Sequence, residues 1–117
     1  MAGLREVVQD LAARADVDAV VVLSSDGLPI DSAGREQVDV EAVAALAASF
    51  VNGARRLGQA AECEGFTTGV LEFDGRLALL RPLGTEGHLF ILGAARSNAG
   101  PLLYDLRQRA PELAALL

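Results

Sequence analysis

The segment from Val38 to Glu62 constrains the fold more than any other part of the chain, because it forms a long helix with two apolar faces. At about 3.6 residues per turn, the larger side chains make one stripe, the Phe50 stripe: Val43, Leu46, Phe50, Ala54, Leu57 and Ala61. About 80° away, smaller side chains make the Val51 stripe: Val40, Ala44, Ala47, Val51 and Gly58. One sheet needs only one covering face. We therefore expect the Phe50 stripe to cover the chain's own sheet and the Val51 stripe to meet the same helix of a second copy.

Of the two glycines inside this helix, only one lies in an apolar stripe. Each costs about 1 kcal/mol relative to alanine in a helix interior. Gly58 lies in the Val51 stripe, where the lack of a side chain would let a neighbouring helix approach closely. Nothing in the sequence explains Gly53.

Composition limits the chain to one domain and narrows its partners. With 117 residues there is room for a single core, so residues 1–117 are assigned to one domain. Ten basic residues are scattered among sixteen acidic ones, giving a net charge of −6, which argues against a nucleic-acid partner. No lysine is present, which excludes P-loop lysine and Schiff-base chemistry. A single cysteine and the lack of a long apolar run are typical of a cytoplasmic protein that does not insert into membranes.

Before the long helix, the pattern indicates a helix and a hairpin. Apolar residues recur at helical spacing over 4–14. The continuous β-branched run over 19–23 predicts a strand buried on both faces. Residues 24–27 end in Asp-Gly and predict a turn, after which 28–30 return in an extended form. Because Pro29 has no N–H to donate, this returning strand is expected at a sheet edge.

After the N-cap Asp39, the long helix is expected to end near Gly65, a residue suited to the left-handed conformation past a helix end. A second Asp-Gly pair, Asp74 and Gly75, predicts another hairpin. Pro101 suits the first turn of a last helix, which Pro111 should interrupt or end, although residues 112–117 could form one more turn. The remaining strands are expected over 66–73, 76–81 and 88–93.

The resulting α-β-β-α-β-β-β-α order predicts an α+β fold with one five-stranded, mostly antiparallel sheet. Two hairpins merge most economically in the order 2-1-5-4-3, which leaves strands 2 and 3 at the edges. Strand 3 contains no proline and one charge, so its edge is open to pairing with another chain. The expected dimer interface therefore combines the Val51 stripe with strand 3: Val40, Ala44, Ala47, Val51, Gly58, Thr67, Thr68, Gly69, Val70 and Leu71.

This series of motifs resembles the Roadblock/LC7 domain family, in its bacterial, MglB-like branch. The matching parts are the hairpin VVVLSSDGLPI at 20–30, the alanine-rich helix at 39–62, the Asp74–Gly75 hairpin, the strand GHLFIL at 87–92 and the helix start PLLYDL at 101–106. The likeness spans nearly the whole chain. No one motif is diagnostic, and the order of the motifs carries the resemblance, which implies the profilin-like architecture of the family.

The resemblance also implies a function. It implies a homodimer whose third strands pair into one continuous sheet, with the two long helices packed together on it. It further implies a partner, a small Ras-like GTPase of the MglA kind. MglB-like members act as GTPase-activating partners that remodel the site of the GTPase itself and do not insert an arginine finger.

The polar face of the long helix is where we would expect such a partner to bind. It contains Glu41, Ser49, Asn52, Arg55, Arg56 and Gln59. Docking of two helices would join two such faces into one surface above the sheet. The alternative is an ordinary solvated helix face, because long charged side chains usually lie in water.

Catalytic groups are scarce. His88 is the single histidine and no nucleophile motif accompanies it, which favours a structural role. Cys63 lies between Glu62 and Glu64, two anions that disfavour the reactive thiolate. The chain lacks enough histidine and cysteine for a metal site of the usual kind. We therefore expect no catalytic residue, no metal and no cofactor, and hence no enzyme activity of its own.

Three functional hypotheses follow. The first is a homodimeric regulator that binds a small GTPase, and this hypothesis includes activation of GTP hydrolysis by the GTPase. The second is an adaptor or scaffold subunit of a larger signalling or motor-type assembly, with no effect on GTP hydrolysis. The third, less favoured, is a small-molecule sensor, because similar five-stranded sheets often enclose ligands. The rate of GTP hydrolysis separates the first from the second, and a co-purified ligand would favour the third.

Overall fold

The computed structural model describes residues 3–35 and 37–117, and it confirms the predicted order of elements and strands. The sheet has the order β2-β1-β5-β4-β3, and every pair of neighbours is antiparallel. The helices are α1 (Leu4–Ala12), α2 (Val40–Ala60) and α3 (Ala99–Ala115). The strands are β1 (Val17–Ser24), β2 (Pro29–Gly34), β3 (Gly69–Phe73), β4 (Arg76–Leu83) and β5 (Gly87–Gly93).

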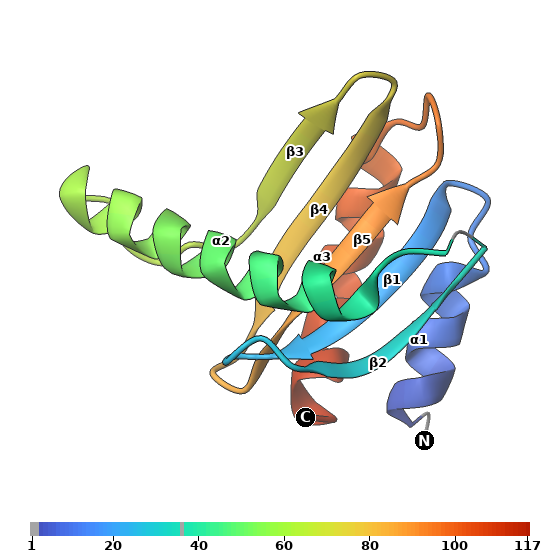
Figure 1. Ribbon diagram of the computed structural model, residues 1–117, viewed down its shortest axis with the longest axis horizontal. Helices are drawn as coiled ribbons and strands as arrows, with labels where there is room; N and C mark the ends of the chain where they lie inside the picture. Colours follow the sequence, from blue (N-terminus) through green and yellow to red (C-terminus); the bar gives the residue numbers. More distant parts are fainter. Residues whose placement is uncertain (1–2, 36) are drawn as a thin grey trace.

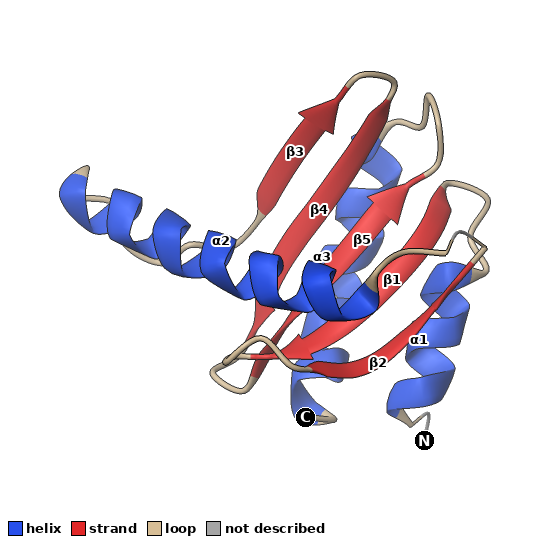
Figure 2. Cartoon of the chain, viewed as in Figure 1, coloured by secondary structure: helices blue, strands red, loops and turns tan. Residues whose placement is uncertain are grey.

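The sheet separates two helical layers (Figures 1 and 2). Helix α2 crosses one face, called the front face here, and α1 and α3 cover the rear face. Alternate residues of β1 supply both cores, as Val20 and Val22 pack with α1 and α3 while Val21 and Leu23 pack with α2. This two-sided burial is why β1 reads as a continuous apolar run.

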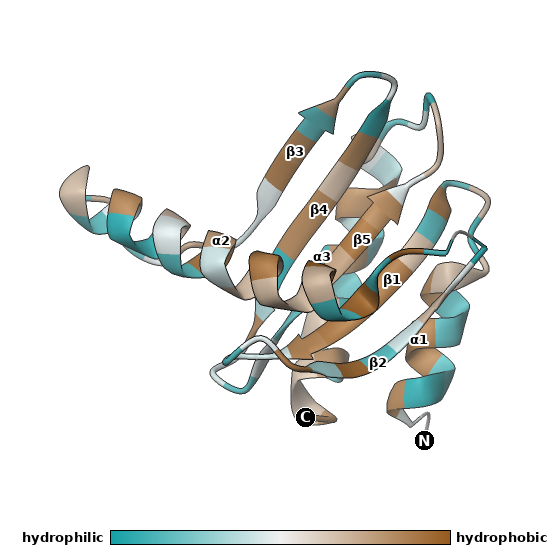
Figure 3. Ribbon diagram, viewed as in Figure 1, coloured by the Kyte–Doolittle hydropathy of each residue, from teal (hydrophilic) through white to brown (hydrophobic). Residues whose placement is uncertain are grey.

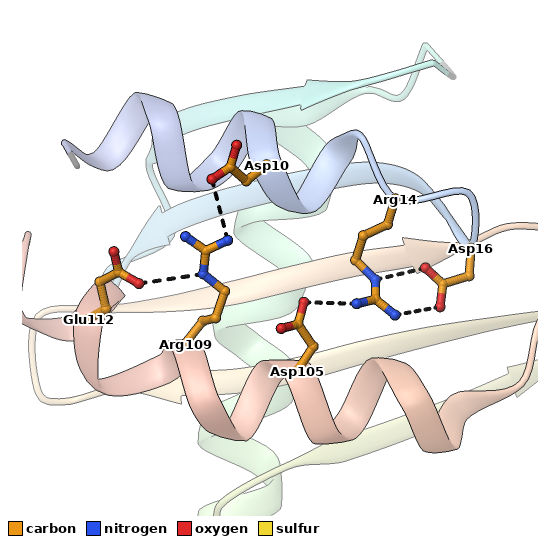
Figure 4. Close-up of polar contacts among 6 residues, drawn as sticks. All are labelled: Asp10, Arg14, Asp16, Asp105, Arg109 and Glu112. Atoms are coloured by element: carbon orange, nitrogen blue, oxygen red, sulfur yellow. Dashed lines mark hydrogen bonds and ion pairs between the residues drawn. The ribbon is translucent and has the colours of Figure 1, made fainter.

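The two rear helices are linked by charged side chains (Figure 4). The guanidinium of Arg14 contacts Asp16 at 2.8 Å and Asp105 at 2.9 Å, which joins the end of α1 to α3. Further along, Arg109 of α3 lies 3.5 Å from Asp10 of α1. The hydrogen bonds from Arg14 hold the pKa of the Asp16 carboxyl below its usual value.

Strand β4 and helix α3 both continue through a proline. Strand β4 continues through Pro82 to Leu83, beyond the residues that pair with β3, so the missing N–H of Pro82 breaks no bond to β3. Helix α3 does not end at Pro111 and runs on to Ala115. The physical reason is burial, because Leu113 is fully enclosed in the rear core and holds the last turn in place.

The end of α2 also differs from the prediction. Glu62, and not Gly65, takes the left-handed conformation that ends the helix, with φ of 59°. The N–H groups of Glu62 and Cys63 donate to the carbonyls of Gln59 and Gly58, at 3.2 and 2.7 Å, which is the Schellman arrangement. A Cβ on Gly58 would come within 2.6 Å of the Cys63 carbonyl oxygen. The turning back of its own chain therefore accounts for Gly58, a reason that the sequence pattern did not indicate.

Candidate functional site

The face of α2 that packs on the chain's own sheet is the Val51 stripe, and not the Phe50 stripe as predicted. Ala44 and Val51, which were expected at a dimer interface, are fully buried against the front face, and Ala47 is 6% exposed. Val40 is also partly buried there. Ala44 and Val51 have no surface left for a partner, so their assignment to the dimer interface is wrong.

The reason is the space between the helix and the sheet. Val21, Leu23 and Leu80 rise from the front face, and the small side chains of Ala44 and Ala47 let α2 lie close above them. The tight turn before β2 approaches the helix as well, since a Cβ on Gly27 would lie 3.3 Å from the Cα of Ala45. Residue size is the signal in the sequence that could have indicated this arrangement.

The Phe50 stripe is consequently left open. Leu46 and Leu57 are 70% and 72% exposed, and Phe50 is 37% exposed. Beyond Val51 no residue of α2 is buried, and the C-terminal half of the helix extends past the edge of β3 (Figure 1). Apolar residues recur along this overhanging half (Figure 3). An isolated helical stretch of this length is marginal in water, and this half of α2 has no buried residue that would stabilise it.

A groove lies between α2 and the open end of the sheet. Its walls come from α2, β3 and the two strands beside it, and all are apolar: Val43, Leu46, Ala47, Phe50, Leu71, Phe73, Leu80 and Phe90. Phe73, at the C-terminal end of β3, is 57% exposed. Exposed apolar grooves of this kind are typical of protein–protein contacts.

The two sheet edges differ as the sequence indicated. At the β2 edge, Arg5 of α1 pairs with Asp31 at 2.6 Å and donates to the carbonyl oxygen of Ser32 at 2.7 Å. Strand β3 pairs with β4 on one side, and it is the last strand in the sheet order, with no other strand of the described residues beside it. The β3 edge is thus the open one.

Strand β3 is shorter than the prediction, because the chain needs residues 61–68 to return from the overhang of α2. Thr67 and Thr68 therefore lie outside the strand. Thr67 is exposed, while the hydroxyl of Thr68 accepts a hydrogen bond from Arg81 at 2.8 Å. Of the remaining interface residues, Gly69 is buried, Leu71 is half-buried and Val70 is 47% exposed.

All six residues predicted to bind a partner are exposed along the other flank of α2: Glu41, Ser49, Asn52, Arg55, Arg56 and Gln59. Helical geometry places them on the side of α2 away from the groove, toward the turn that contains Gly27. The structure thus brings them together on one surface.

The titratable residues do not form a reaction centre. His88 is 1% exposed, and neither of its ring nitrogens has a hydrogen-bond partner among the described residues. Burial, helped by the positive charge of Arg55, lowers the pKa of His88. Cys63 is exposed at the end of α2. Across residues 3–35 and 37–117, no cluster of three or more histidine, cysteine or acidic side chains could hold a metal ion, and no helix could cross a membrane.

Known structures share this fold over nearly its full length. MglB of Myxococcus xanthus superposes with a TM-score of 0.88 at 20% identity, covering 97% of this chain and 93% of that one. A Roadblock/LC7 domain from Streptomyces avermitilis gives 0.86 at 22% identity, with 97% of both chains covered. The gliding protein MglB of Thermus thermophilus gives 0.87 at 12% identity, covering 97% and 87%.

Sequence comparison gives the family directly. No curated protein is significantly similar to this chain. Residues 4–93, however, match the family model of the Roadblock/LC7 domain, which therefore covers α1, α2 and all five strands. The chain belongs to the Roadblock/LC7 domain family.

Proposed function

We propose that the protein is a homodimeric regulator that binds a small Ras-like GTPase of the MglA kind. Two copies join through the open β3 edge and the Phe50 stripe, and the polar flank of α2 forms the surface for the GTPase. The membership of the Roadblock/LC7 family and the likeness to structures named MglB support a regulatory role.

The observation that carries the dimer is the overhang of α2 beside an open strand edge. The exposed apolar side-chain area is on the order of 400 Å² per copy, which equals the area of large functional patches on protein surfaces. This area belongs to Leu46, Phe50, Leu57 and Phe73. Together with the backbone of a paired strand, this surface approaches the roughly 800 Å² per partner of a stable interface. In a homodimer, the overhang of one copy covers the groove of the other.

Light scattering on a sizing column tests the dimer. We expect the wild-type protein to be dimeric at about 50 μM, well above the Kd of a stable interface. The double variant L46R/L57R should be monomeric, because it places unpaired charges in an apolar contact. The matched control N52R adds the same charge to the polar flank of α2 and should remain dimeric. A monomeric wild type, or a dimeric L46R/L57R, would refute this interface.

Turnover of an MglA-type GTPase, measured with and without the protein, tests the regulatory part. Stimulated hydrolysis supports an activator. The charge-reversed variant R55E/R56E should bind the GTP-loaded GTPase at least about tenfold more weakly, a loss of about 1.4 kcal/mol, and should stay dimeric. Binding with unchanged turnover would favour the adaptor hypothesis. Unchanged affinity in R55E/R56E would show that the polar flank is not the contact surface.

A further inference from the structure

The open strand β3 has a sequence that favours one particular pairing with itself. An antiparallel pair of edge strands related by a two-fold axis keeps the front faces of both sheets on the same side. Each residue must then lie opposite a residue of the same face, because side chains alternate between faces along a strand. The axis therefore runs between the two strands, midway between the two copies of one β3 residue, and the alternatives differ by steps of one residue in the position of that axis.

We infer that the axis runs between the two copies of Leu71, so that the two Leu71 residues of the dimer face each other. This inference rests on the proposed homodimer and specifies its register. Strand β3 comprises Gly69 to Phe73, and Leu71 is its midpoint. Centring on Leu71 is the only choice that pairs all five strand residues, and each shift of the axis by one residue leaves two of them unpaired.

On the front face, this register sets Gly69 opposite Phe73 of the second copy. A Cβ on Gly69 would lie 3.0 Å from the ring of Phe50, which is tighter than most Cβ contacts, so a side chain there would have to displace that ring. Phe73 is 57% exposed in the isolated chain. With opposite Cβ positions about 5 Å apart, Phe73 of each copy would cover the glycine of the other and contact the Phe50 ring beside it. Both exposed aromatic rings are thereby enclosed.

The rear face distinguishes the neighbouring registers. An axis at Leu71 sets Glu72 opposite Val70, whereas an axis at Glu72 would set two carboxylates directly against each other, which is destabilising. An axis at Val70 would set Phe73 opposite Thr67 and Glu72 opposite Thr68. Neither threonine belongs to the strand, and the Thr68 hydroxyl is already bonded to Arg81.

Disulfide cross-linking tests the register. Opposite residues of an antiparallel pair have Cα atoms about 4.5–5.5 Å apart, within the reach of a disulfide, whereas residues offset by two positions lie about 7–8 Å apart. The background is C63S, which removes the exposed native thiol. With diamide as the oxidant, L71C should form at least about ten times more covalent dimer than V70C, because only facing thiols have a high effective concentration.

A second variant, which combines V70C and E72C, tests the same register from the rear face and leaves the groove intact. It should also form covalent dimer, while V70C and E72C alone should not. Light scattering of the reduced C63S protein separates the two levels of the proposal. A monomer would overturn the homodimer and the register together. A dimer in which V70C or E72C cross-links alone, or in which neither L71C nor the double variant does, would overturn the register and leave the homodimer standing.

Discussion

Replacing His88 by leucine should stabilise this protein, although the histidine is one of its most enclosed side chains. His88 lies in β5 between Leu23 of β1 and Pro82 of β4, and alternation along β5 places it on the front face beneath α2. It is 1% exposed, and both ring nitrogens lack a partner among the described residues. Its imidazole therefore loses its hydrogen bonds to water on folding, and the backbone of Gly87 compensates only in small part.

The size of the effect follows from that loss. An unsatisfied buried donor or acceptor costs about 1–3 kcal/mol. Leucine has a similar volume and no polar atom, so H88L removes the cost with little change in packing, and some of the gain is offset by imperfect fit. We expect the free energy of unfolding to rise by about 1–3 kcal/mol. The control H88Q keeps a polar side chain that does not titrate and should show no such gain.

The same histidine makes stability depend on pH. Burial, and then the charge of Arg55, lower the pKa of His88 in the folded state, whereas in the unfolded chain it keeps its usual value of about 6.5. Below that pH the unfolded chain binds a proton that the folded chain does not. Stability is therefore complete above about pH 6.5 and falls as the pH is lowered through the folded-state pKa.

Urea unfolding at several pH values from 8 down to 5 (roughly the range in which histidine titrates) measures both effects. The wild type should lose stability on acidification, and H88L and H88Q should lose less, while only H88L is more stable at pH 8. A wild-type protein with the same pH slope as H88Q would show that His88 does not titrate in the buried form assigned to it. An H88L variant less stable than H88Q at pH 8 would refute the cost assigned to the ring nitrogens.

Three further predictions concern single residues, each checked by urea unfolding. G53A should stabilise by about 1 kcal/mol, because a Cβ there meets nothing within 4 Å, whereas G58A in the same helix should destabilise by overlapping the Cys63 carbonyl. G34A should cost about 3 kcal/mol or more, since Gly34 has a positive φ and a Cβ would overlap the backbone of β1. R14Q should cost about 1 kcal/mol at pH 7 by removing the links to Asp16 and Asp105, and less as the pH falls through the lowered folded-state pKa of Asp16. An equal effect of G53A and G58A would contradict the Schellman end of α2.

Much of the fold follows from short-range patterns in the sequence. Asp74 and Gly75 form the predicted two-residue turn, because Gly75 supplies the positive φ that such turns need. Asp39 caps α2 by accepting a hydrogen bond from the N–H of Ala42 at 3.1 Å. Such features depend on a few adjacent residues, so they are readable without any knowledge of distant contacts. The same is true of the sheet order, since hairpins and the long helix leave few ways to join the strands.

The sequence by itself thus determined that α2 has two apolar faces and that one sheet edge is open. Only the tertiary structure decided which face is free. The periodicity of the sequence shows only which side chains are apolar, and the hydrophobic effect favours the burial of either stripe. Which stripe is buried depends on the space above Val21, Leu23 and Leu80. Alanines fit into that space, whereas Leu46 and Leu57 would hold the helix too far from the sheet. That room is set by strands distant in sequence, and it leaves the larger residues of α2 exposed beside β3.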